Sequence, residues 1–340
     1  MSRKLAKIKI ISNILPIENA DAIELINFDD CSWQCVAKKN EFKIGDKCIY
    51  FEIDSLLPNL NPVFDFLSKG NTVKTINFEG VEYTGYRLRT VKLRGELSQG
   101  LALPLSSFPE IDYTNEDIDG QLKIIKYDAV QFTTGNEIGN FHEHIPKTDE
   151  ERVQNLTAKF DLWQDIEMVA TEKLDGTSCT VSFENGIKRI FGRQYELPIG
   201  LGDAYDLATK NITILDNYSV QGEVIGKVIG TPVQGDLYKQ EGIYFYAFNV
   251  FNILTHSYLP HEEFIQFCKS YDFETVPVIW EGKLSEFKDI KNLLLFAEGK
   301  SQLCSTAERE GLVFRSKSFE KNKRISFKVI SNKFLLKSKD

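Results

Sequence analysis

Short segments of alternating apolar and polar residues dominate roughly the first 140 positions of the chain. Alternation of this kind, with many β-branched and aromatic residues, is typical of half-buried β-strands. Turn-forming residues such as Gly45, Asp46 and Pro58 separate the segments. Because the strands are short and helices are few, we expect a small barrel or sandwich, and a closed barrel of about five strands fits the length. The segments are KIKIIS, QCVAKK, KCIYFEI, YRLRTVKLRG and GLALPL.

A polar segment that contains one proline, HEHIPKT at 142–148, is the predicted linker to a second part of the chain. Thr148 and Glu151 have the spacing of a capping box. This spacing predicts a helix that begins near Asp149 and carries Arg152 in its first turns.

Apolar strand candidates and helical patterns alternate in the second part. The strands SCTVSF and IKRIFGR flank Asn185-Gly186, which is a strong hairpin signal. Helical periodicity predicts helices over 261–270 and over about 285–298. The second part is therefore expected to be α+β. Its further strand candidates are QGEVIG, IYFYAFNVF and GLVFR.

Composition is typical of a globular protein, with 42% hydrophobic and 26% charged residues among 340. No apolar stretch approaches the roughly 18 residues that a membrane span needs, so we expect no membrane partner. The start, MSRKLAKIKIIS, is basic and then apolar, but its apolar run is short and alternates with lysine. It resembles a strand more than a signal peptide.

The six cysteines show no paired metal-ligand spacing except Cys31-x-x-x-Cys35, and no second pair completes a site. Scattered reduced thiols are the favoured interpretation, which predicts an intracellular protein. The net charge of −8 argues against indiscriminate nucleic-acid binding by the whole surface. Local basic runs at 84–95 and 316–328 leave room for a local binding groove.

Charged residues recur at the ends of the apolar strands of the second part. Arg193 closes IKRIFGR, Glu223 lies in QGEVIG, Glu310 precedes GLVFR and Lys328 lies in RISFKVIS. A lone charge among apolar neighbours is costly unless it finds a partner. One such charge is commonly a solvated strand end, but several at successive strands are consistent with a shared cleft.

The sequence Lys173-Leu174-Asp175-Gly176 is the most suggestive chemical motif. On its own K-x-D-G arises by chance in roughly one chain in ten of this length. Its context decides the matter, because further motifs follow it in a fixed order. They are Ile190-Phe191-Gly192-Arg193, Gly222-Glu223, Tyr246-Ala247-Phe248-Asn249, Glu310-Gly311-Leu312-Val313 and Phe327-Lys328-Val329-Ile330.

In this order the segments resemble the nucleotidyltransferase superfamily of ATP-dependent ligases and mRNA capping enzymes. KTDEERVQN at 147–155 and SNKFLLK at 331–337 are similar to its RNA ligases that seal nicks in duplex RNA. KLRGELSQGLALP at 92–104 resembles the N-terminal OB module of Naegleria-type RNA ligases. The resemblance implies an OB-type β-barrel over 1–143, followed by an α+β nucleotidyltransferase (adenylation) domain over 144–340.

The resemblance also implies roles for the motif residues. Lys173 is the expected nucleophile, which attacks the α-phosphorus of ATP before AMP passes to an RNA 5′-phosphate and a 3′-OH displaces it. The amine must be neutral to attack, so its pKa must fall from about 10.4. Arg193, Lys328 and a divalent cation are the expected sources of positive charge. Lys328 is placed on the α-phosphate.

The remaining roles concern the nucleotide and its metal ion. Asp175, Glu223 and Glu310 are expected to hold the water ligands of Mg²⁺ (or Mn²⁺), and Glu223 also to meet the ribose. Phe248 is expected to stack on adenine, and Arg152 to reach the phosphates or the RNA 5′ end. The groups expected to hydrogen-bond to the adenine edge are Thr171, Glu172 or nearby backbone groups, and the resemblance does not choose among them. The expected catalytic residues are Lys173, Lys328 and Arg193; the expected ATP ligands are Lys173, Glu223, Phe248, Lys328, Arg152 and Arg193.

Each of these residues also has a plainer interpretation. In this interpretation Glu223 and Glu310 are solvated strand ends. Phe248 is a core residue, and Arg193 pairs with a surface carboxylate. His142-Glu143-His144 suggests a metal site but lacks a third ligand, so a solvated linker is favoured. The alternating Arg87, Arg89, Lys92 and Arg94 suit either a solvated sheet face or a phosphate-tracking groove.

Two positions depart from the superfamily pattern. Ile330 stands where a second lysine is frequent in the fifth motif, and Lys333 is a candidate substitute for that charge. Asn249 stands where aspartate is frequent.

The expected function is an ATP- and Mg²⁺-dependent RNA ligase for RNA repair. Its partner is RNA with 3′-OH and 5′-phosphate ends, at nicks in a duplex, and the protein is expected to act as a monomer. A DNA ligase or a GTP-using capping enzyme is the first alternative, although both carry an OB module after the catalytic domain and none is expected here after the fifth motif. A non-catalytic RNA-binding relative is the second, although a binder has no need of Lys173.

Overall fold

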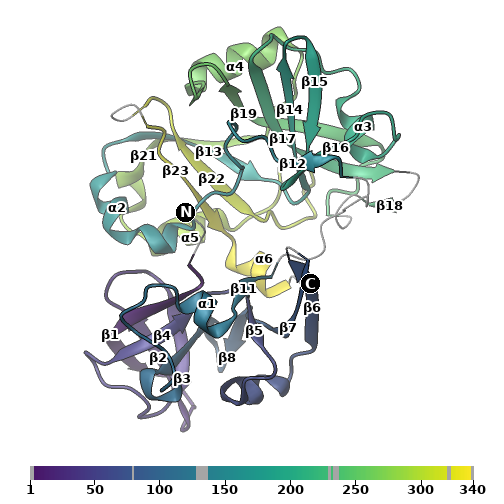
Figure 1. Ribbon diagram of the computed structural model, residues 1–340. Helices are drawn as coiled ribbons and strands as arrows, with labels where there is room; N and C mark the ends of the chain where they lie inside the picture. Colours follow the sequence, from purple (N-terminus) through teal and green to yellow (C-terminus); the bar gives the residue numbers. More distant parts are fainter. Residues whose placement is uncertain are drawn as a thin grey trace. The chain divides into compact units, whose positions relative to one another are not determined.

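The computed structural model describes residues 4–78, 80–127, 137–228, 231–232, 237–319 and 323–337 (Figure 1). These residues form two compact units. The first holds the described residues up to 127 together with 154–158 and 335–337, and the second holds 137–153 and 159–334. In the described residues, no helix has the length and apolar character needed to cross a membrane.

A five-stranded antiparallel sheet in the order β10-β4-β1-β2-β3 forms the centre of the first unit. Trp33, Cys35 and Tyr50 are almost fully buried in its core. Strand β3 also lies against β9, where Gln34 Nε2 donates to the Leu97 carbonyl at 2.9 Å. The predicted small barrel is thus confirmed. Its strands are β1 (Ala6–Pro16), β2 (Ile23–Phe28), β3 (Gln34–Lys38), β4 (Lys47–Phe51), β9 (Glu96–Gln99) and β10 (Leu101–Pro104).

A second sheet of the first unit has the order β11-β5-β7-β6. Phe51, Phe64 and Phe108 pack together beneath it, with ring centroids 5.5–5.8 Å apart. Strand β8 pairs with β9 as a separate hairpin. The bounds are β5 (Ser55–Pro58), β6 (Val73–Phe78), β7 (Val81–Arg87), β8 (Thr90–Leu93), β11 (Ile125–Lys126), η1 (Pro62–Ser68), η2 (Leu105–Ser107) and α1 (Ile118–Leu122).

The larger sheet of the second unit has the order β12-β16-β15-β14-β17-β19-β20, with β18 paired to β17. The predicted hairpin is present, because Asn185 and Gly186 adopt φ angles of 54° and 74° between β14 and β15. Such a turn needs positive φ at both positions. The strands are β12 (Gly139–Asn140), β14 (Thr177–Glu184), β15 (Ile187–Phe191), β16 (Tyr195–Leu197), β17 (Tyr218–Val228), β18 (Thr231–Pro232), β19 (Ile243–Asn252) and β20 (Ser257–Tyr258).

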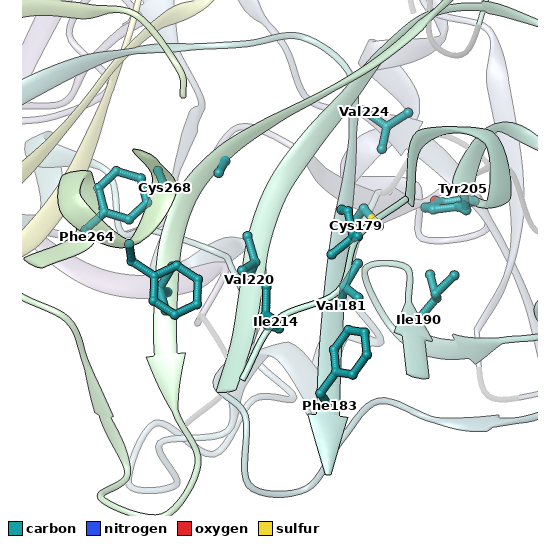
Figure 2. Close-up of a cluster of buried hydrophobic side chains, with 14 of the residues drawn as sticks. Cys179, Val181, Phe183, Ile190, Tyr205, Ile214, Val220, Val224, Phe264 and Cys268 are labelled. Atoms are coloured by element: carbon teal, nitrogen blue, oxygen red, sulfur yellow. The ribbon is translucent and has the colours of Figure 1, made fainter. Parts of the chain in front are cut away.

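Helices α3 (Ala204–Thr209) and α4 (His261–Ser270) pack against the larger sheet. Figure 2 shows the buried core, in which Val181 of β14 and Val220 of β17 share a cluster with Phe264 of α4. Helix α4 has the bounds that the sequence predicts. Burial of this cluster fixes β14, which directly follows the K-x-D-G turn, and β17, which pairs with β14.

The smaller sheet of the second unit has the antiparallel order β21-β13-β22-β23. Phe327 of β23 stacks on Phe314 of β22 and on Trp163, at 5.2 and 6.0 Å between centroids. The elements are β13 (Glu167–Lys173), β21 (Val278–Lys283), β22 (Gly311–Ser316), β23 (Ser326–Ile330), η3 (Val153–Leu156), α2 (Thr157–Leu162), η4 (Leu284–Phe287), α5 (Ile290–Ala297) and α6 (Asn332–Lys337).

The predicted helix over 285–298 is interrupted. The short η4 ends at Phe287, its C-cap Lys288 has a φ of 59°, and α5 begins only at Ile290. Asp289 caps α5, because its side chain accepts from Asn292 N at 2.7 Å. A local cap therefore divides one periodic pattern into two helices.

The capping-box prediction at Thr148 and Glu151 was wrong. The segment is extended, and the first helical residue after it is Val153. The Glu151 carbonyl accepts from Lys328 N at 2.8 Å, and Arg152 pairs with Lys328 in a parallel bridge. Hydrogen bonding to a neighbouring strand thus replaces the helix that the local pattern favours.

Candidate active site

Strand pairing brings the sequence-distant motif residues together. Strand β13 ends at Lys173, which pairs with Gly311 at the start of β22, and Gly311 pairs with Ile330 of β23. Ser178, just after the turn, pairs with Glu223 of β17. The charged strand ends therefore meet at one place, as the pattern of lone charges suggested.

Lys173 and Glu310 form an ion pair, with Nζ 2.7 Å from Oε2. Burial lowers the pKa of the Lys173 amine, but Glu310, Glu223 and Asp175 raise it by more, so the net shift is upward. The lysine therefore rests as an ammonium ion. This direction is opposite to the lowered pKa that a nucleophilic amine needs.

Glu223 is the other strongly perturbed group. Burial raises the pKa of its carboxyl to about 8, with further increases from Glu310 and Asp175, against the lowering effects of Lys173 and the Gly176 N–H. Three acidic side chains thus surround one ammonium group, and the raised pKa of Glu223 means that it keeps its proton near neutral pH. A cation that arrives here would meet acidic oxygens and would favour the loss of that proton.

Close packing and two tyrosine hydroxyls hold the K-x-D-G turn. A Cβ at Gly176 would lie 2.5 Å from the Val224 carbonyl oxygen, so only glycine allows the turn to approach β17. The Tyr238 hydroxyl accepts from Asp175 N at 2.6 Å. The hydroxyls of Thr177 and Tyr205 share a hydrogen bond of 2.8 Å. The backbone directly after Lys173 is therefore constrained.

Phe248 lies at a β-bulge. Gln221 pairs with Asn249 and Gly222 pairs with Ala247, so Phe248 is the extra residue of β19. A bulge redirects a side chain and is frequent near active sites. Phe248 is half-buried, against a cluster that contains Leu174.

Asp149 joins two of the predicted cations. Its carboxylate lies 2.8 Å from Arg193 NH2 and 3.7 Å from Lys328 Nζ. Arg193 does pair with a partly exposed carboxylate, as its plainer interpretation expected, yet that carboxylate also contacts a motif residue. Arg152 lies buried beside Lys328. The structure thus gathers Arg152, Arg193 and Lys328.

Glu172 has an unused acceptor in a buried position. Its side chain is 1% exposed, and Oε2 accepts from Gln302 N at 2.8 Å. Its Oε1 is buried with no hydrogen-bond partner in the described residues. Thr171, by contrast, is engaged with Arg315 NH1 at 3.2 Å and with a backbone carbonyl. Burial raises the pKa of Glu172.

The described residues contain no group of three His, Cys, Asp or Glu side chains placed to chelate a metal ion directly. All six cysteines are free. His142 is not the solvated linker residue that we expected, because it is buried and its Nε2 lies 2.7 Å from Glu184 Oε1. His144 and Glu143 are exposed.

The departures from the motif pattern have local explanations. Lys333 Nζ lies 2.9 Å from Glu298 Oε2, while Ile330 is buried. Asn249 accepts from Arg324 at 2.6 Å and donates to Gln221 at 3.1 Å. An amide can do both, whereas an ionised aspartate has no proton to donate.

The basic run in the first unit is divided among different elements. Arg87 lies 3.1 Å from Asp54 and stacks over Tyr127, so it belongs to a local ion pair. Lys92 and Arg94 are exposed on the β8–β9 hairpin. The four charges therefore do not form one alternating strand face.

Solved structures of the Naegleria gruberi RNA ligase are similar to this chain over nearly its whole length. A lysine-to-methionine mutant with AMP and Mn is 36% identical, with a TM-score of 0.87, and the match covers 99% of this chain and 100% of that one. A lysine-to-alanine mutant with ATP and Mn is 36% identical, with a TM-score of 0.85, covering 98% of each chain. The same ligase with PPi is 36% identical, with a TM-score of 0.84, covering 98% of each chain.

The chain belongs to the RNA ligase family. A family model described as RNA ligase matches residues 166–330, and one described as an OB-fold domain matches residues 5–105. The search of curated proteins found no match. The predicted order of an OB-fold domain followed by an RNA ligase domain is confirmed.

Sequence reasoning missed three residues of this RNA ligase that lie at the candidate site. Asp149 was placed in a helix, and its contacts with Arg193 and Lys328 depend on an extended segment. Tyr205 and Tyr238 lie outside every motif. Asp149 is one of three consecutive acidic residues, Asp149, Glu150 and Glu151, so no sequence signal singled it out, and no pattern marked the tyrosines.

Proposed function

We propose that this RNA ligase is ATP-dependent and works through a lysyl-AMP intermediate on Lys173. The observation that carries the proposal is the position of the Lys173 amine, 2.7 Å from Glu310 among three acidic residues. Arg193 and Lys328 are gathered on Asp149. The relatives that bind ATP, AMP or PPi support the nucleotide assignment for this chain.

The carboxylates explain how the resting ammonium becomes a nucleophile. A bound Mg²⁺ or Mn²⁺ supplies positive charge that lowers the pKa of the amine. Asp175, Glu223 and Glu310 are not arranged to chelate an ion directly, but their charge suits the retention of its water ligands. With their charge offset, Glu310 no longer holds the proton on Lys173, and the neutral amine can attack.

The reaction has three steps. The Lys173 ammonium gives one proton to solvent, and Nζ then forms a bond to the α-phosphorus of ATP while the bond to pyrophosphate breaks and a second proton leaves Nζ for solvent. An RNA 5′-phosphate oxygen then attacks that phosphorus, and the amine leaves and regains both protons. Finally a 3′-OH loses its proton to solvent and attacks the RNA 5′-phosphate, and the bond between that phosphate and AMP breaks. Lys328, Arg193 and Arg152 would offset the negative charge of the phosphates in each step.

Adenine recognition is assigned to Phe248 and Glu172. Phe248 is half-buried at its bulge, which leaves part of the ring open for stacking. The unpartnered Oε1 of Glu172 would accept from the adenine 6-amino group. Guanine carries an oxygen at that position, which would face a second acceptor. This arrangement favours ATP over GTP.

The finer substrate assignment is a nick in duplex RNA with 3′-OH and 5′-phosphate ends, in RNA repair. The domain boundary near residue 143, the action as a monomer and a role of the OB-fold domain in positioning RNA belong to the same proposal. The family assignment favours RNA over DNA. The motif lysine and carboxylates, brought together in one site, favour an enzyme over a passive RNA binder.

The test is incubation of the full chain with labelled ATP and, separately, labelled GTP, followed by nicked duplex RNA. We expect label on the protein from ATP alone, followed by transfer to RNA and sealing. Label from GTP would indicate a capping enzyme, and sealing of nicked DNA but not RNA would indicate a DNA ligase. RNA binding without any label would indicate a non-catalytic relative.

A further inference from the structure

A cavity of about 340 Å³ lies beside the candidate active site, within the second unit. One wall is the extended segment 147–150, and the other is 323–326. Asn249 and Tyr258 complete the lining. None of the motif roles described above accounts for this cavity.

A parallel bridge and a side-chain hydrogen bond join the two walls. Arg152 pairs with Lys328 in the bridge, and Ser326 Oγ donates to Glu150 Oε2 at 2.6 Å. Each wall contributes one lysine to the lining, Lys147 from the first and Lys323 from the second. Both lysines are exposed and line the cavity, and among the described residues neither has an ion pair.

A buried cation lies deeper in the same cavity. The Arg324 side chain is only 10% exposed, and its guanidinium lies 3.7 Å from the centre of the Tyr258 ring. Its NH1 donates to Asn249 Oδ1 at 2.6 Å. These contacts hold the guanidinium in place. Glu150 is shared between Arg315 and Arg324 and so offsets only part of their combined charge, which leaves net positive charge inside the cavity.

The two carboxylates that line the cavity already have cationic partners. Asp149 is held by Arg193 and Lys328. Glu150 accepts from Ser326 and lies 3.8 and 3.9 Å from Arg315 and Arg324. Among the described residues that line the cavity, Lys147 and Lys323 are therefore the charged side chains without an ion-pair partner, which favours an anionic ligand.

We propose that this cavity, between Lys147 and Lys323 with Arg324 inside, binds a backbone phosphate of the RNA substrate next to the reacting end. The proposal rests on the proposed function, which supplies RNA as the substrate. Arg324 lies four residues before Lys328, roughly 13 Å away along an extended chain. A polynucleotide carries phosphates along its whole length, so it can place one phosphate near Lys328 and another in the cavity near Arg324. The triphosphate of ATP, bound at Lys328, is too short to do both.

The test compares the double variant Lys147→Ala/Lys323→Ala with wild type in binding of nicked duplex RNA at several salt concentrations. We expect roughly tenfold weaker binding, because two solvent-exposed ionic contacts are lost. The slope of log affinity against log salt should fall by about one to two units. Lys147→Arg/Lys323→Arg keeps both charges and should retain the wild-type slope. Lys269→Ala/Lys291→Ala removes two exposed lysines from α4 and α5 and is the matched control.

A second arm measures lysyl-AMP formation from ATP without RNA. We expect this reaction to fall much less than RNA binding in the Lys147/Lys323 variant. An equal fall would assign the cavity to the phosphates of ATP, and unchanged RNA affinity and slope would mean that no RNA phosphate binds there; either result overturns the proposal. Failure of wild type to form lysyl-AMP or to seal RNA would instead overturn the proposed function, so the two failures are distinguishable.

Discussion

The amine of Lys173 and the carboxylate of Glu310 lie 2.7 Å apart, so the candidate nucleophile rests in an ion pair. Burial alone would lower the pKa of the amine, but the neighbouring acidic groups reverse the shift. In an ATP-dependent ligase with this arrangement, Lys173 stays unreactive until the negative charge of the neighbouring acidic side chains is offset. The resting state therefore couples activation of the lysine to binding of a cation.

Glu223→Gln should stabilise the protein at alkaline pH in metal-free buffer. The pKa of Glu223 is raised to about 8, against 4.5 for an ordinary glutamate, so the folded state binds an extra proton between these values. Stability should therefore fall as pH rises through this window. Melting curves in a chelator at pH 5 and pH 9 should show the variant gaining over wild type only at pH 9. An equal gain in stability at both pH values, or no gain at either, would contradict the raised pKa. Glu263→Gln, at an exposed position of α4, is the control.

Glu172→Gln should weaken the preference for ATP over GTP. A glutamine amide can donate to the guanine oxygen as well as accept from the adenine amino group, whereas the carboxylate Oε1 can only accept. We expect the ratio of lysyl-nucleotide formation rates to fall by about tenfold. Glu281→Gln, on neighbouring β21, should leave the ratio unchanged. A wild-type ratio in the Glu172 variant would show that backbone groups or Thr171 read the base instead.

Tyr238→Phe should slow lysyl-AMP formation without changing any charged group. The lost hydroxyl accepts from Asp175 N at 2.6 Å and so fixes the turn after the nucleophile. We expect about a tenfold lower rate at saturating ATP, with a stability loss of about 1 kcal/mol. Tyr244→Phe loses a hydroxyl that donates to the exposed Glu241 carbonyl and serves as the control. If both variants react like wild type, the hydrogen bond from Asp175 N to the Tyr238 hydroxyl is not needed for lysyl-AMP formation.

Only part of this site followed from the sequence. Lys173, Glu223, Glu310 and Lys328 were identified because each lies in a short local motif and the motifs occur in a fixed order. Antiparallel strand pairing then brings these residues together in the folded chain. The role of the 148–152 segment did not follow, because its capping pattern competes with hydrogen bonds to β23 that exist only in the folded chain.

The bulge at Phe248 shows the same limit. Its position depends on a register shift between β17 and β19, and an aromatic strand gives no sign of where such a shift falls. Likewise, the alternation of Arg87 with later cations predicted one strand face, but the chain turns between β7 and β8, and Arg87 pairs with Asp54.

Three cations of the OB-fold domain should contribute to RNA binding through phosphates. They are the half-buried Arg89 and the exposed Lys92 and Arg94, because Arg87 is engaged with Asp54. Their combined change to Ala should lower the slope of log affinity against log salt by up to about two units, while lysyl-AMP formation falls less. A salt titration of nicked RNA binding checks this. An unchanged slope and affinity would leave the hairpin as a solvated surface.

Covalent capture of AMP tests the central claim most directly. The full chain is incubated with ATP and Mg²⁺, digested, and its peptides are mapped by mass spectrometry, alongside Lys173→Ala. The account predicts AMP on the peptide that contains Lys173, attached to that side chain, and none on the variant. AMP on another residue, or on the Lys173→Ala protein, would contradict it.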